Sequence, residues 1–167
     1  MVKALLLVLV LLACAAAGRS LSNGRRRRSE LLSELLAGMR VLRLRMLNSM
    51  EPLGILLRKS DAALLRDLGN RLWEGESLAE SWIAMRTEEI KRGRRLDCLT
   101  EHDMRILDGF FRKLGISGRE EQSELFTASI AELEEAYSGA RKLFAEASKT
   151  YTALGALIGV GICIIII

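Results

Sequence analysis

Few residues in this chain have side chains suited to covalent or metal chemistry. There is one histidine, His102, and the three cysteines, Cys14, Cys98 and Cys163, form no Cys-x-x-Cys pair. A structural zinc site or a disulfide framework needs such side chains in closely spaced sets. The sequence also lacks the glycine-rich phosphate-binding, metalloprotease and serine-hydrolase motifs. We therefore expect no enzyme activity, no metal and no cofactor.

The chemistry that the sequence favours is electrostatic contact. The net charge is +4, but residues 19–45 hold eight Arg against two Glu, and residues 119–146 hold seven Glu against three bases. A nucleic-acid-binding protein usually carries a broad basic stripe with aromatic side chains for stacking. Here aromatic residues make up only 5%. The composition therefore favours neither nucleic acid nor a small-molecule substrate as a partner.

Two groups of charged residues are candidate partner surfaces, because each could meet an oppositely charged protein surface. One is a basic loop, with Lys91, Arg92, Arg94 and Arg95. The other is acidic and lies on the outer face of a long predicted helix, with Glu132, Glu135 and Glu146. The alternative interpretation is an ordinary solvated turn and a solvated helix face.

The first eighteen residues are almost entirely apolar, apart from Lys3. As a helix they are long enough, at about 25 Å, for a short membrane anchor. The basic cluster Arg25, Arg26, Arg27 and Arg28 follows, and clustered Arg after an apolar segment marks the cytoplasmic interface. We expect an anchor over 1–18 and a basic linker over 19–29. The alternative is an exported lipoprotein or secreted helical domain with residues 1–13 cleaved, since residues 11–14 read Leu-Leu-Ala-Cys.

The other end of the chain predicts a second anchor over 150–167, because residues 151–167 contain no charged side chain. Lys149 and Tyr151 are residue types typical of the membrane interface. Gly155 and Gly159 are four residues apart, which would let another helix pack closely. The alternative for these two glycines is that they are incidental small residues.

Residues 30–149 are rich in Leu, which favours helices. We expect them to form one cytoplasmic domain. Apolar spacing, a proline and capping signals indicate helices over 29–50, 52–59, 62–73, 77–90, 100–114 and 117–149. The fold class is therefore all-α: a small antiparallel bundle of about six helices, flanked by N- and C-terminal transmembrane helices. Ser77–Glu80, Thr100–Asp103 and Ser117–Glu120 have the spacing of capping boxes.

Apolar stripes at helical spacing predict the core. In the first helix of the domain they are Leu32, Leu35, Leu36, Met39, Leu42 and Met46. In the last helix they are Leu125, Ile130, Leu133, Tyr137, Ala140, Leu143 and Phe144. We also expect Trp73 and Trp82 in the core, His102 on the surface, and Gly115 in a left-handed helix cap.

Several short segments resemble one known family in their order and spacing. They are Glu51-Pro52-Leu53, where the family tends to have Thr-Pro-Leu; residues 76–82; Leu114-Gly115-Ile116-Ser117 followed by Gln122; residues 140–151; and Leu154-Gly155 with Gly159 before a run of Ile. On these segments the chain resembles the stage III sporulation protein AB family. The family's soluble region is similar to the helical cytoplasmic domain of the F-type platform protein of type II secretion systems.

The resemblance implies a role in the channel complex that links the mother cell to the engulfed forespore during endospore formation. It implies partners among the other stage III sporulation channel proteins, including the AA ATPase, together with membrane lipid. It also implies a location in the cell membrane of a spore-forming bacterium, on the mother cell side, with the soluble domain facing the cytoplasm. Likeness of fold alone is weak support for function. Here it agrees with two apolar ends and the absence of a catalytic motif.

Overall fold

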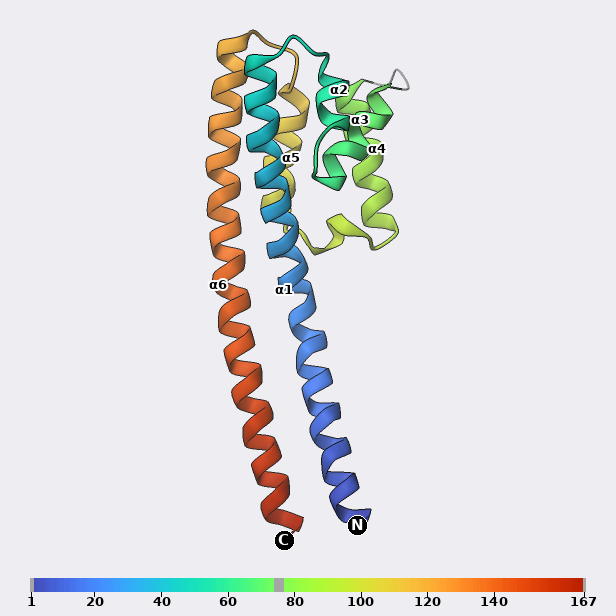
Figure 1. The fold of residues 1–167 in the computed structure, drawn as a ribbon, viewed down its shortest axis with the longest axis vertical. Coiled ribbons are helices and arrows are strands. Elements are labelled where there is room, and N and C mark those ends of the chain that lie inside the picture. The colour runs from blue at the N-terminus through green and yellow to red at the C-terminus, as the bar shows by residue number, and fades with distance from the viewer. Residues whose placement is uncertain (1, 74–76, 167) are drawn as a thin grey trace. The chain divides into compact units, whose positions relative to one another are not determined.

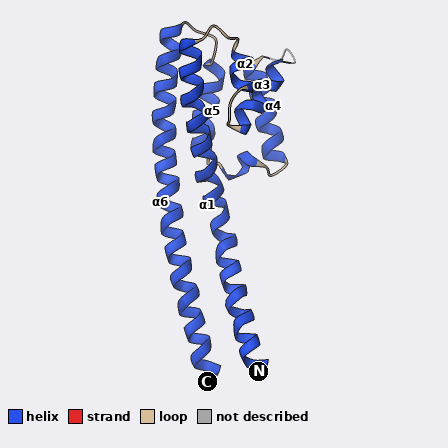
Figure 2. Ribbon diagram, viewed as in Figure 1, coloured by secondary structure: helices blue, strands red, loops and turns tan. Residues whose placement is uncertain are grey.

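The computed structural model describes residues 2–73 and 77–166, with side chains for 23–72 and 77–146. Over these residues the secondary structure is entirely helical (Figures 1 and 2). The elements are α1 (Val2–Asn48), α2 (Leu53–Arg58), α3 (Ala63–Trp73), α4 (Leu78–Lys91), the 3-10 helix η1 (Arg95–Cys98), α5 (Glu101–Lys113) and α6 (Arg119–Ile166). The predicted all-α bundle of about six helices is confirmed.

The chain divides into two compact units. One comprises residues 1–29 and 139–167, so it contains the first part of α1, the last part of α6 and both chain termini (Figure 1). The other comprises residues 30–138 and contains every element from the second part of α1 to the first part of α6. We call this second unit the helical domain.

Helix α1 is longer than the sequence indicated. We expected a linker over 19–29 and a helix starting at Ser29, but α1 runs without interruption from Val2 to Asn48. The expected helix start is therefore wrong. This stretch contains no proline and five arginines, which are good helix formers, so the weak helix formers Asn23 and Gly24 are not sufficient to end the helix. The division into anchor, linker and domain stays a prediction.

In the helical domain α1 and α6 pack against each other in opposite directions. Arg40 forms an ion pair with Glu134, and Arg43 donates a hydrogen bond to Ser123 Oγ at 3.3 Å. The expected stripe of α1 is confirmed from Leu32 to Leu42, where its members are at most 4% exposed, whereas its last member, Met46, is only half-buried.

The expected stripe of α6 is partly wrong. Phe126 and Ala136, which we had not included, are buried, whereas Leu125 is only half-buried and Leu143 is 49% exposed. The buried face of α6 in the domain includes two polar residues and follows a spacing of four and three: Gln122, Phe126, Ser129, Leu133 and Ala136. Because Gln122 and Ser129 are polar, apolar periodicity alone rotates the predicted face toward Leu125.

The short helices α2 to α5 pack in sequence, with α2 on α3, α3 on α4, and α4 on α5. Their starts follow local rules. Thr100 and Asp103 form the complete predicted capping box at the start of α5. Ser77 accepts a hydrogen bond from the backbone of Glu80 at the start of α4. Gly69 allows α3 to approach α2, because a Cβ there would lie 2.5 Å from the backbone nitrogen of Arg58.

Aromatic side chains from three helices form the centre of the domain. The rings of Trp82 on α4 and Phe111 on α5 lie 4.4 Å apart, and Phe110 on α5 meets Phe126 on α6 at 5.1 Å. All four side chains are at most 1% exposed. The predicted core position of Trp82 is confirmed, whereas the side chain of Trp73 lies outside those that the structure describes. These contacts fix α4, α5 and the start of α6 as one packed body.

Candidate functional site

The turn between α5 and α6 is built around a buried glutamine. Gly115 adopts a φ of +79°, as the predicted left-handed cap requires. Its backbone N–H donates to Gln122 Oε1 at 3.0 Å, and Gln122 Nε2 donates to the carbonyl of Lys113 at 3.0 Å and to Ser117 Oγ at 2.6 Å. Gln122 is 2% exposed, so the turn is held by polar bonds shielded from water.

This arrangement differs from the expected capping box of Ser117 and Glu120. The helix begins at Arg119, and the N–H of Gln122 donates to the carbonyl of Gly118, so Gly118 takes the capping position. The hydroxyl of Ser117 instead accepts from the Gln122 side chain. Periodicity and capping rules did not reveal the role of Gln122. The signal was its fixed place after Leu114-Gly115-Ile116-Ser117 in the family resemblance.

The same turn presents an apolar side chain to solvent. Ile116 is 78% exposed although both of its neighbours belong to the turn that Gln122 holds. Beside it lies an open hollow of about 470 Å³, whose apolar lining comes from Ile116, Leu125 and Ala128. An exposed Ile on a turn with a fixed conformation is suited to contact with another protein.

The carboxylates of α6 differ from those of the rest of the domain. Among the described side chains, the only acids with no hydrogen-bond or ion-pair partner are Asp61 and the α6 residues Glu120, Glu121, Glu124, Glu132 and Glu135. Elsewhere in the domain the described acids other than Asp61 have partners, as in Glu51 with Lys59 and Glu88 with Arg71. Two of the predicted partner residues, Glu132 and Glu135, are thus exposed and available.

The third predicted acidic residue, Glu146, lies on the part of α6 that belongs to the other unit. Its side chain is exposed but is not free of partners. It is therefore a less open contact point than Glu132 or Glu135.

The predicted basic loop divides into two kinds of residue. Arg95 points into the domain, where its Nη2 lies 2.7 Å from Asp67 Oδ2 on α3 and 3.1 Å from Glu89 Oε1 on α4. Its backbone N–H also donates to Glu89 Oε2 at 3.1 Å. Arg95 therefore joins α3, α4 and η1, and sequence spacing gave no sign of this because its partners are 28 and six residues away.

The environment of Glu89 shifts two ionisation equilibria. Glu89 is 4% exposed, and the side-chain hydrogen bond from Arg95 lowers the pKa of this carboxyl below its ordinary 4.5, against the opposing effect of burial. The same hydrogen bond raises the pKa of Arg95 above its ordinary range. Both groups therefore stay charged at neutral pH, as a structural ion pair.

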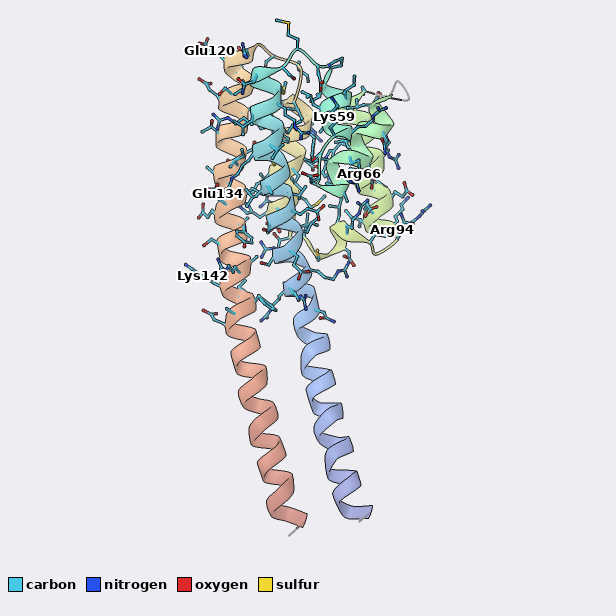
Figure 3. All side chains as sticks on the ribbon, in the orientation of Figure 1. Lys59, Arg66, Arg94, Glu120, Glu134 and Lys142 are labelled. Atoms are coloured by element: carbon cyan, nitrogen blue, oxygen red, sulfur yellow. The ribbon has the colours of Figure 1, made fainter. Side chains whose placement is uncertain are left out.

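The other three residues of the basic loop are exposed. Arg92 forms an ion pair with Glu88 at 2.9 Å and caps the end of α4, and Arg94 lies 3.9 Å from Glu89 and extends into solvent (Figure 3). Lys91 has no hydrogen-bond or ion-pair partner among the residues that the structure describes. The basic partner surface, still a prediction, thus reduces to Lys91, Arg92 and Arg94.

The predicted membrane-interface residues are only partly described. Arg25, Arg26 and Arg27 are exposed and Arg28 is half-buried on α1. The structure does not describe the side-chain surroundings of residues 1–18 and 150–167, nor of Lys149. The predicted interface residue Tyr151 and the predicted packing residues Gly155 and Gly159 therefore lie outside the described residues. Among the residues that the structure describes with their side chains, no helix combines the length and the apolar character needed to cross a bilayer.

Catalytic or metal chemistry gains no support from the geometry. The described residues contain no group of three His, Cys, Asp or Glu side chains placed to hold a metal ion. His102 is exposed in the first turn of α5, as predicted, and the Cys98 thiol donates to the carbonyl of Arg95 at 3.2 Å.

Comparison with known proteins gives one family and one structure. The model of a family described as stage III sporulation protein AB matches residues 3–167. No curated protein matches the chain. A solved structure described as stage III sporulation protein AB (SpoIIIAB) has a TM-score of 0.57 at 19% identity, covering 71% of this chain and 97% of that chain. At this identity the structural likeness shows a shared fold alone. Because the family match extends over nearly the whole sequence, the chain belongs to the stage III sporulation protein AB family.

Proposed function

We propose that this protein is a non-enzymatic platform component of the secretion-like channel between mother cell and forespore. Both apolar ends, 1–18 and 150–167, anchor it in the mother cell membrane, and the helical domain faces the cytoplasm. There it docks the AA ATPase and other stage III sporulation channel proteins. The observation that carries the proposal is the family match over residues 3–167.

Two features of the domain support a docking role. Exposed carboxylates remain unpaired on α6, whereas a domain that only had to fold would gain by pairing or dispersing them. The turn held by Gln122 exposes Ile116 at a fixed position. Both features suit a basic, partly apolar protein surface.

Topology is the direct test of the anchors. Reporter domains inserted after Lys59 in the full-length protein, expressed in a spore-forming host, should be active only as cytoplasmic reporters. Clustered Arg resists translocation, and Arg25 to Arg28 lie between the first apolar segment and the reporter. Activity of an export-dependent reporter at the same position would refute the proposed topology.

The intact mass of the mature protein distinguishes a retained first segment from the alternative in which that segment is removed. A retained anchor leaves the full mass of the chain, 18.6 kDa. An exported lipoprotein would lose residues 1–13 and gain lipid on Cys14. Finding that lipidated form would replace the platform proposal with the exported one.

Docking through α6 has its own test. Reversing Glu132, Glu135 and Glu146 to Lys should weaken co-purification of the channel proteins while leaving the melting temperature nearly unchanged, because the three side chains are exposed. Unchanged co-purification would exclude this face of α6. Reversing Lys91, Arg92 and Arg94 to Glu tests the basic loop in the same way.

A further inference from the structure

The hollow beside the turn between α5 and α6 has a lining that is both apolar and acidic. Ile116, Leu125 and Ala128 provide the apolar surface, Glu121 and Glu124 also line the hollow, and Lys113 is the one cation among its lining residues. Its volume of about 470 Å³ falls within the range of roughly 300–1,000 Å³ that is usual for binding pockets.

We propose that this hollow receives the apolar face of a basic amphipathic helix from a partner protein. The inference rests on the proposed function and deepens it, because it states the chemistry of the segment that the domain docks. Helices bind apolar grooves through side chains spaced three and four residues apart. A hollow lined by α5 and α6 side chains, with Ile116 at its edge, offers such a groove.

Charge complementarity identifies the partner segment as basic. Glu121 and Glu124 are three residues apart, as are Glu132 and Glu135, and like charges at this spacing destabilise a helix. None of these four has a partner within the described chain. A cationic segment would relieve both repulsions at once.

The spacing along α6 defines the segment further. Glu121, Leu125, Ala128, Glu132 and Glu135 follow one another at intervals of four, three, four and three residues, so they share one side of the helix. The two acidic pairs are centred about 16 Å apart along the helix axis. We therefore expect a docked helix with bases about three turns apart and apolar residues between them.

The hollow is also formed before any partner binds. The Gln122 bonds fix the turn that carries Ile116, so little conformational freedom is lost on docking. This favours a folded helix as the occupant, because preformed grooves bind rigid segments with the smallest entropic cost.

A synthetic helical peptide tests the proposal with full-length protein in detergent. The probe carries Leu along one face and Lys about three turns apart, and a control peptide carries Glu in place of each Lys. Fluorescence anisotropy should show the Lys peptide binding at least about tenfold more tightly than the Glu peptide. No binding of the Lys peptide, or equal binding of both, would overturn the proposal.

Matched variants locate the peptide. Ala128→Trp fills the hollow and should weaken binding about tenfold or more, whereas Ala131→Trp, at an exposed alanine outside its lining, should not. Glu121→Lys should weaken binding several-fold and Glu120→Lys, on the same turn of helix but outside the lining, much less. Equal effects within either pair would place the peptide elsewhere.

Crosslinking in the sporulating host distinguishes the source of the helix. A photoreactive residue at position 116 should capture a different protein, through a peptide with Lys or Arg beside apolar residues. Capture of a second copy of this chain, or of an acidic peptide, would overturn the proposal. These results are separate from the topology test, because the peptide assay measures the hollow whichever side of the membrane the domain faces.

Discussion

Gln122 on α6 holds Gly115 in the preceding turn: the Oε1 atom of its side chain accepts a hydrogen bond from the Gly115 N–H at 3.0 Å. The same side chain donates from Nε2 to the carbonyl of Lys113 and to the hydroxyl of Ser117. One buried amide thereby satisfies the backbone at the end of α5 and orders the turn that leads into α6. The spacing between Leu114-Gly115-Ile116-Ser117 and Gln122 in this chain places the amide within reach of the turn.

Removing the Gln122 amide should therefore destabilise the domain. Gln122→Ala leaves the Gly115 N–H and the Lys113 carbonyl without this partner, and we expect a loss of about 1–3 kcal/mol in the free energy of unfolding. Urea denaturation measures the loss, and hydrogen exchange should show faster opening at Gly115. Thr127→Ala is the matched control, because Thr127 is exposed on the same helix and bonds only to the Ser123 carbonyl. A loss for Gln122→Ala as small as for Thr127→Ala would contradict this role.

Substitution by alanine should have opposite effects on the stability of the domain at Gly115 and at Gly109. Gly115 has a φ of +79°, and a Cβ there would lie 2.8 Å from Leu53 Cδ2, so Gly115→Ala should cost about 1–2 kcal/mol. Gly109 is exposed in the interior of α5 with nothing within 4 Å of an added Cβ. Gly109→Ala should stabilise the domain by about 0.5–1 kcal/mol. Thermal unfolding of the two variants checks the opposite signs, and a shift in the same direction for both would refute the prediction.

Asp108 links α4 and α5 through the tryptophan of the core. Trp82 Nε1 donates to Asp108 Oδ1 at 2.7 Å, and Arg86 forms an ion pair with the other carboxylate oxygen. Because Trp82 is fully buried, Asp108→Ala leaves its indole N–H without this acceptor and should cost about 1–3 kcal/mol.

Asp108→Asn is the control for that experiment, because an amide oxygen can still accept from the indole while the charge facing Arg86 is lost. We expect Asp108→Asn to lower the free energy of unfolding, measured by chemical denaturation, less than Asp108→Ala does. A double-mutant cycle with Trp82→Phe isolates the hydrogen bond, and a coupling energy near zero would show that the indole does not depend on Asp108.

The ion pair of Glu89 and Arg95 should make stability depend on pH. Since the hydrogen bond from Arg95 keeps the pKa of Glu89 below 4.5 in the folded state, this stabilisation is fully present above about pH 4.5 and is lost as the pH falls through the folded pKa. Glu89→Gln should therefore be less stable than the parent by about 1–3 kcal/mol at neutral pH. The difference should narrow on acidification.

Denaturant titrations between neutral pH and about pH 3 measure this narrowing. Glu101→Gln is the matched control, because Glu101 pairs with Arg105 on an exposed surface where ion pairs contribute little. A difference between parent and Glu89→Gln that stays constant with pH would show that protonation of Glu89 does not contribute.

The sequence by itself determined most elements of the domain, although it did not indicate η1 or the uninterrupted course of α1. Local rules acting within a few residues were sufficient for the capping box of Thr100 and Asp103, the left-handed Gly115 and the limits of α2 to α5. The apolar stripe of α1 was also clear, because all its core positions are Leu or Met at helical spacing. Family membership followed from short segments whose order and spacing are shared.

Only the tertiary structure decided which polar residues belong inside. Gln122 is buried on α6 because its amide is satisfied by a turn that packs against it, and its presence shifts the buried face from Leu125 to Phe126. Arg95, half-buried in the predicted basic loop, pairs with Glu89 and with Asp67, which lie six and 28 residues away and meet it in the folded domain. Burial of a polar group is favourable only when hydrogen-bond partners satisfy it in the folded chain. Apolar periodicity does not show which polar residues gain such partners.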